Sequence, residues 1–146
     1  MSYQGIIIAA TAVGNSGKTT AIRGTWDALK SQGANVISED IQKCRIPGKV
    51  GDVTGVLEYQ GVRIGISSWG DPGINQKGIL QDFIQAKCRI IICACRTWGQ
   101  TKDPIDALQK NWVIRYLGPA KNGFVSRNDV ENEVKKAVQE IKSGKI

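Results

Sequence analysis

The sequence predicts a single α/β domain, built on a mainly parallel β-sheet with helices on both sides of the sheet. The first observation is that apolar, β-branched runs alternate along the chain with segments of helical periodicity. The second is the run from Gly5 to Val13, which is apolar and β-branched apart from the hydroxyl of Thr11, as a central parallel strand buried on both faces would be. The third is the length of 146 residues, which fits one hydrophobic core and therefore one domain over residues 1–146.

The elements of the first half follow from local patterns. Residues 17–31 repeat apolar residues at helical spacing and predict a helix. Residues 35–38 predict a short second strand. Two strand-like runs within residues 53–67 are separated by Gln60-Gly61, which predicts one antiparallel hairpin with its glycine at a positive φ.

The elements of the second half are predicted in the same way. Residues 76–86 form a helix, and residues 89–95 form another buried strand. Asp103 is expected to be the N-cap of a short helix that starts at Pro104 and runs to Leu108. Residues 112–117 form the last strand. Ser126 then opens a final helix, because a Ser-x-x-Asp sequence precedes valines at helical spacing.

The composition limits the classes of function. The net charge of +7 favours anionic partners such as nucleotides, phosphorylated metabolites or nucleic acid. The basic residues are scattered, which favours a solvated surface, so that nucleic-acid binding rests only on the charge and the four Trp residues. Histidine is absent, which excludes every mechanism that uses imidazole. No apolar run approaches the length of a membrane span and no secretory signal is visible, so we expect a cytoplasmic protein without a membrane partner.

The segment between the first strand and the first helix carries the chemistry. It contains Gly14 and Gly17, and glycines allow a backbone to curl so that successive N–H groups converge on an anion. The helix that follows adds its free N–H groups and the positive end of its dipole. Residues 12–19, Ala-Val-Gly-Asn-Ser-Gly-Lys-Thr, resemble the Walker A loop of P-loop nucleoside triphosphatases and kinases, with Ala12 at the position where the pattern has its first Gly.

This resemblance implies a three-layer α/β/α P-loop fold whose mainly parallel sheet includes the antiparallel hairpin. It implies a binding site for a nucleoside triphosphate and Mg²⁺, with Lys18 bridging the β- and γ-phosphates and the hydroxyl of Thr19 completing the metal shell. The residues expected to contact the nucleotide here are Val13, Gly14, Asn15, Ser16, Gly17, Lys18, Thr19 and Thr20.

Such sites also need a carboxylate, from a neighbouring strand, that holds Mg²⁺. Asp71 is the favoured candidate, because the hairpin before it looks like that of small GTPases, where an Asp after the strand meets the metal. The match is imperfect, since a GTPase has Asp-x-x-Gly and here Gly73 comes two residues after Asp71. The alternative is Asp40 after the second strand, where many P-loop kinases place an acid that faces the acceptor or a metal-bound water.

Two further positions are expected at the same edge of the sheet. Arg96 leaves the end of a buried strand, where a phosphate would be a natural partner for its charge, and an ion pair with Asp71 or Asp103 is the alternative. The loop that contains Pro119 follows the last strand, and in P-loop folds that loop often touches the base. No Asn-Lys-x-Asp motif for reading guanine is present, which favours ATP over GTP.

The sequence therefore predicts Mg²⁺-dependent binding and hydrolysis of a nucleotide, with ATP favoured. Lys18 and Arg96 would neutralise developing charge, and Asp71 or Asp40 would orient water or an acceptor. One alternative is a small kinase that transfers the γ-phosphate to an acceptor, which itself could be a phosphorylated small molecule. Another is a non-catalytic switch or subunit that acts on a partner protein.

Overall fold

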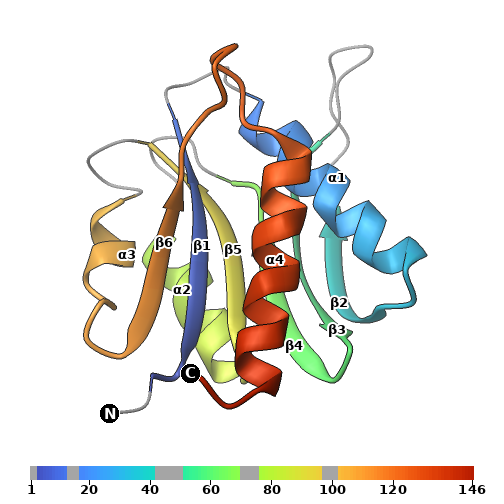
Figure 1. Cartoon of the computed structure of the whole chain (residues 1–146), viewed down its shortest axis with the longest axis vertical. Coiled ribbons are helices and arrows are strands. Elements are labelled where there is room, and N and C mark those ends of the chain that lie inside the picture. The colour runs from blue at the N-terminus through green and yellow to red at the C-terminus, as the bar shows by residue number, and fades with distance from the viewer. Residues whose placement is uncertain (1–2, 13–16, 42–50, 70–75, 97–101) are drawn as a thin grey trace.

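A computed structural model describes residues 3–12, 17–41, 51–69, 76–96 and 102–146 of the chain. The fold is mixed α/β, with a six-stranded, mostly parallel sheet and helices on both of its faces (Figure 1). No helix in these described ranges is long and apolar enough to cross a membrane.

The strand order in the sheet is β2-β3-β4-β5-β1-β6. The β4–β5, β5–β1 and β1–β6 pairs are parallel, whereas β3 runs antiparallel to both of its neighbours, β2 and β4. The strands are β1 (Gly5–Thr11), β2 (Asn35–Ile41), β3 (Val53–Tyr59), β4 (Val62–Ser67), β5 (Ile90–Cys95) and β6 (Trp112–Leu117).

The centre of the sheet is apolar on both faces, as the continuous apolar run of β1 predicts. β1 and β5 pair in parallel register, with Ile6 opposite Ile90 on one face and Ile7 opposite Ile91 on the other. All four of these isoleucines are fully buried. These two strands therefore form the buried middle of the domain, and Ala12, which follows β1, contacts Lys18 of the candidate site.

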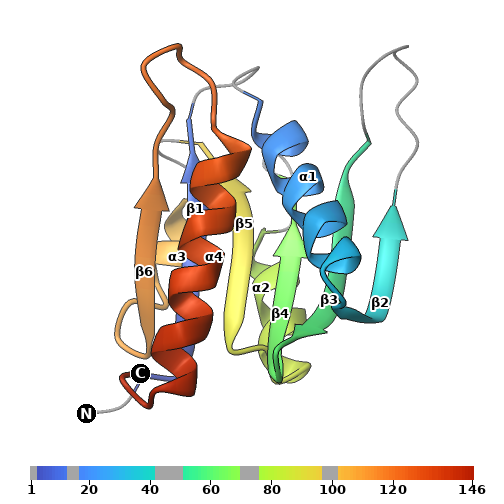
Figure 2. The ribbon, with the colours of Figure 1, turned by 45° about the vertical axis from the view of Figure 1, so that its right-hand side comes forward.

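The four helices found among the described residues divide between the two faces of the sheet, as Figure 2 shows. One face packs against α1 and α4 through Trp26, Leu29, Val130 and Val134, among others. The other face packs against α2 and α3 through Leu80, Phe83 and Ile105. The helices are α1 (Lys18–Ser31), α2 (Gln76–Gln85), α3 (Asp103–Asp106) and α4 (Arg127–Lys142).

The predicted hairpin is confirmed as β3 and β4 with a two-residue turn. Gly61 has φ 79°, as expected, and Gln60 also has a positive φ of 51°. Two positive φ values are what a tight turn between two twisted strands requires. The predicted cap of the last helix is confirmed as well, since the backbone N–H of Asp129 donates to the hydroxyl of Ser126 at 3.3 Å.

Three details differ from the prediction. β2 extends to Ile41, because an edge strand with exposed side chains tolerates charged residues, so Asp40 lies inside the strand instead of after it. Asp103 is the first residue of α3 and not its N-cap, which is Lys102. β4 is not a neighbour of β1, since β5 lies between them.

Candidate functional site

The candidate site lies where α1 begins, at the carboxyl ends of the parallel strands. Gly17 precedes the helix with φ 77°, a left-handed conformation that a glycine adopts without steric cost. The first hydrogen bond of the helix runs from the N–H of Ala21 to the carbonyl of Gly17, at 2.9 Å. The N–H groups of a first helical turn have no carbonyl partner within the helix, so this end favours an anion.

Lys18 is the first residue of α1 and is nearly buried, with 8% of its surface exposed. Its Nζ donates to the carbonyl oxygen of Ala12 at 2.8 Å, which ties the start of the helix to the end of β1. Burial raises the pKa of the nearby Cys95 thiol, whereas a hydrogen bond with Thr11 and the charge of Lys18 lower it by less.

Thr19 contacts a carboxylate that the sequence analysis did not single out. Its hydroxyl donates to Oδ1 of Asp52 at 3.2 Å, although the two residues are 33 positions apart. The same Oδ1 accepts a 2.7 Å hydrogen bond from the hydroxyl of Ser68, which follows β4. The structure thus brings a helix-start hydroxyl and a carboxylate together, which is an oxygen pair that suits Mg²⁺.

Asp52 is held in place by the open end of the hairpin. The N–H of Val53 donates to the hydroxyl of Ser68 at 2.9 Å, and the N–H of Ser68 donates to the carbonyl of Val53 at 2.9 Å. From the helix side, Arg23 of α1 donates to the carbonyl of Gly51 at 3.5 Å. The carboxylate is therefore fixed between α1 and the ends of β3 and β4.

Arg96 lies at the same edge, directly after β5. Its carbonyl accepts a 3.3 Å hydrogen bond from the hydroxyl of Thr11 at the end of β1. The next backbone bond, from the N–H of Ala12 to the carbonyl of Cys95, measures 3.3 Å. The half-buried Arg96 is thus attached to the strand that leads into the candidate site.

The segment after β6 reaches the start of α1 through Phe124. A Cβ atom at Gly17 would lie 3.5 Å from Cδ1 of Phe124, so the ring stands beside the first residue of the site. Phe124 is nevertheless 54% exposed. Its carbonyl accepts from the N–H of Ala120, and its N–H donates to the side chain of Asn122, so this turn is ordered by hydrogen bonds. Pro119 is exposed in the same segment.

A second polar cluster next to this edge is self-neutralised. Lys102 donates to Asp106 at 2.7 Å, lies 4.8 Å from the ring centroid of Tyr116, and has its pKa raised mainly by that hydrogen bond. Asp106 also accepts from the hydroxyl of Tyr116, and its pKa is lowered by Lys102 first and by Tyr116 second. These charges satisfy one another.

The other predicted site residues lie outside the group of contacts around Lys18, Thr19 and Asp52. Thr20 is on α1 and exposed. Asp40 is exposed on β2, and β3, β4 and β5 separate that strand from β1. The remaining predictions, Val13, Gly14, Asn15, Ser16 and Asp71, lie outside the described residues.

Within the part of the chain that the structure describes, no three Cys, Asp or Glu side chains gather into a cluster that could hold a metal by themselves. Comparisons with protein-family models, with curated proteins and with solved structures found no match. The geometry of Lys18, Thr19 and Asp52 is therefore the main indication of function.

Proposed function

We propose that this chain is a small P-loop nucleoside triphosphatase with the three-layer α/β/α fold of that class, which binds ATP with Mg²⁺ at the start of α1 and hydrolyses it. The observation that carries the proposal is the contact between Thr19 and Asp52 beside the nearly buried Lys18. A lysine at a helix start can hold phosphate. A hydroxyl that is hydrogen-bonded to a carboxylate offers two oxygen ligands for a metal ion.

Each described residue has a role that its contacts support. The ammonium group of Lys18 and the N–H groups of the first turn hold phosphate oxygens. The hydroxyl of Thr19 and the carboxylate of Asp52, directly or through water, hold Mg²⁺. When bound, the ion neutralises charge on the phosphates. Arg96 adds a positive charge at the same edge, and Asp71 and Asp40 stay predicted as the acids that orient water or an acceptor.

The segment after β6 is the proposed contact for the base. Phe124 offers an exposed ring next to Gly17, and aromatic rings stack on any nucleobase. Pro119 lies in the same segment. This stacking would favour no particular base, so the preference for ATP rests on the missing guanine-reading motif.

The test measures binding of ATP and GTP, and release of phosphate, as a function of Mg²⁺ concentration. Lys18→Ala removes a charge-assisted contact and should weaken ATP binding by about 10- to 100-fold. Asp52→Asn keeps an oxygen that can accept from Thr19 and Ser68, so the fold should persist. The substitution should raise the Mg²⁺ concentration that ATP binding requires by about 10- to 100-fold.

Asp82→Asn is the matched control, because it removes the same charge from an exposed position on α2, away from the candidate site. Equal ATP affinity of the wild type and Lys18→Ala would refute the proposed site. An effect of Asp82→Asn on the required Mg²⁺ concentration as large as that of Asp52→Asn would refute the metal role of Asp52. Binding without formation of ADP, with or without an added acceptor, would refute hydrolysis and favour a switch, whereas ADP formed only with an added acceptor, which then carries the phosphoryl group, would favour a kinase.

A further inference from the structure

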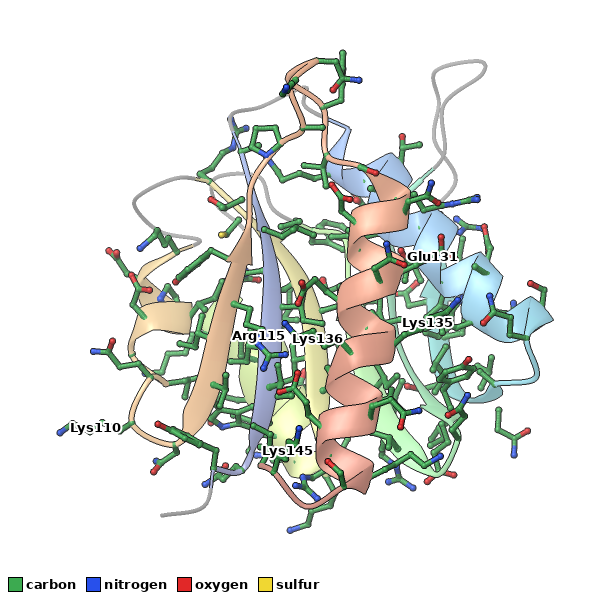
Figure 3. All side chains as sticks on the ribbon, in the orientation of Figure 1. Lys110, Arg115, Glu131, Lys135, Lys136 and Lys145 are labelled. Atoms are coloured by element: carbon green, nitrogen blue, oxygen red, sulfur yellow. The ribbon has the colours of Figure 1, made fainter. Side chains whose placement is uncertain are left out.

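A hollow of about 720 Å³ lies between α4 and the edge strand β6. It is lined by Arg115, Lys136, Gln139, Glu140, Ser143 and Lys145. Figure 3 shows Arg115 and Lys136 in the space between β6 and α4, with Lys145 below them. All six lining residues carry polar or charged groups, and their methylene stems supply the apolar part of the wall.

The charges of the hollow do not balance. Arg115 donates to Glu140 in an ion pair, and the two side chains are 25% and 17% exposed. This pair cancels one positive charge against the only carboxylate of the lining. Lys136 and Lys145 remain, so the lining has an excess of two positive charges.

The arginine has hydrogen-bonding capacity beyond that ion pair. Its NH2 group binds Glu140, whereas its NH1 group is buried and has no hydrogen-bond partner among the described residues. Buried donors are usually satisfied, and a guanidinium group suits the paired oxygens of a phosphate. Oε1 of Glu140 is likewise buried without a partner in the described part of the chain, so the ion pair forms the buried back wall of the hollow, and the guanidinium group adds its charge to that of the two lysines.

The hollow is separate from the candidate nucleotide site. Arg115 lies in the middle of β6, opposite Ile8 of β1, and Lys145 follows the end of α4. α4 runs from the end where α1 begins towards the end where both chain termini lie (Figure 1). The hollow therefore opens at a place that a nucleotide bound at Lys18 would not occupy.

We propose that this hollow is a second binding site, which takes a phosphate-type oxyanion. Lys136 and Lys145 supply the net charge, Arg115 supplies fixed N–H donors, and Glu140 holds the guanidinium group in its orientation. Two sources present this chemistry, namely a free polyphosphate and the backbone of a nucleic acid.

The experiment uses the full chain with Lys18→Ala, which removes the proposed main phosphate contact of the other site. Binding of tripolyphosphate and of a short oligothymidylate is measured by calorimetry at low salt, with amide NMR shifts to locate the ligand. Lys136→Gln with Lys145→Gln removes two charges of the lining. Lys110→Gln with Lys135→Gln is the matched control, because both lysines are exposed and outside the lining (Figure 3).

The lining variant should bind about tenfold more weakly, and the control variant should change affinity by less than about twofold. For the oligonucleotide, the slope of log affinity against log salt should fall by about 1.4, since each lost contact with a single strand contributes about 0.7. Tripolyphosphate binding that depends on the lining supports a free phosphate compound as the source, and binding of the oligonucleotide alone supports nucleic acid. The proposal would be overturned if both double variants lost the same affinity for the probes, or if neither probe bound to the protein.

Discussion

Gly65→Ala tests the packing that holds β4 in its place in the sheet. Gly65 lies in the middle of β4, where the ring of Phe83 from α2 fills the space that a side chain would occupy. A Cβ atom there would be 2.5 Å from Cγ and 2.6 Å from Cδ1 of the ring. Phe83 is only 3% exposed, so the ring has no room to turn towards solvent.

The size of the effect follows from these distances. Ordinary contacts of a Cβ atom begin at 3.4 Å, so ring and strand must separate by roughly 1 Å. Overpacking of this kind costs about 1–3 kcal/mol of unfolding free energy. For a chain of this length, that corresponds to a fall in Tm of roughly 2–12 °C.

The assay is equilibrium unfolding in urea of four proteins: the wild type, Gly65→Ala, Phe83→Leu and the double variant. The smaller leucine should relieve the clash, so the double variant should be more stable than the sum of the single effects by about 1 kcal/mol or more. Gly118→Ala is the control, because a Cβ atom there meets nothing within 4 Å, and it should cost no stability. Additive effects of Gly65→Ala and Phe83→Leu within about 0.5 kcal/mol would refute the reasoning.

Two further predictions concern α1. Hydrogen bonds from Lys30 first, and from the indole of Trp26 second, lower the pKa of Glu39. The charged carboxylate therefore stabilises the fold above the ordinary pKa of 4.5, and this stabilisation is lost as the pH falls below that value. The stability difference between wild type and Glu39→Gln, measured by unfolding against pH, should therefore shrink in acid; a constant difference would contradict it. Gly17→Ala should destabilise the protein by about 1–2 kcal/mol, because Gly17 has a positive φ. Gly17→Asn should cost less, since asparagine tolerates that conformation. A lower Tm for Gly17→Asn than for Gly17→Ala would contradict this explanation.

The elements with strong local patterns could be predicted from the sequence. The apolar run of β1 and the two-residue turn of the hairpin both depend on neighbouring residues, and both are found where predicted. Strand order depends instead on contacts between distant segments. No local pattern indicated that β5 would insert between β1 and β4.

The same distinction applies to the candidate site. Lys18 and Thr19 stand in a recognisable motif, so their position at a helix start could be anticipated. Asp52 could not, because it precedes a strand instead of following one and meets Thr19 only through the packing of the hairpin end against α1. Phe124 was missed for a similar reason, since its place beside Gly17 depends on how the segment after β6 turns.

The hydrogen bond between Thr19 and Asp52 also decides what this hydroxyl can offer. A threonine hydroxyl has one hydrogen and two lone pairs, and here the hydrogen is donated to the carboxylate. Towards anything that approaches the helix start, the oxygen of Thr19 is therefore an acceptor, which suits a cation and repels the oxygens of an anion. The backbone N–H groups around it have the opposite preference. The first turn of α1 thus presents adjacent points of opposite polarity, which fit a metal ion and an anion side by side.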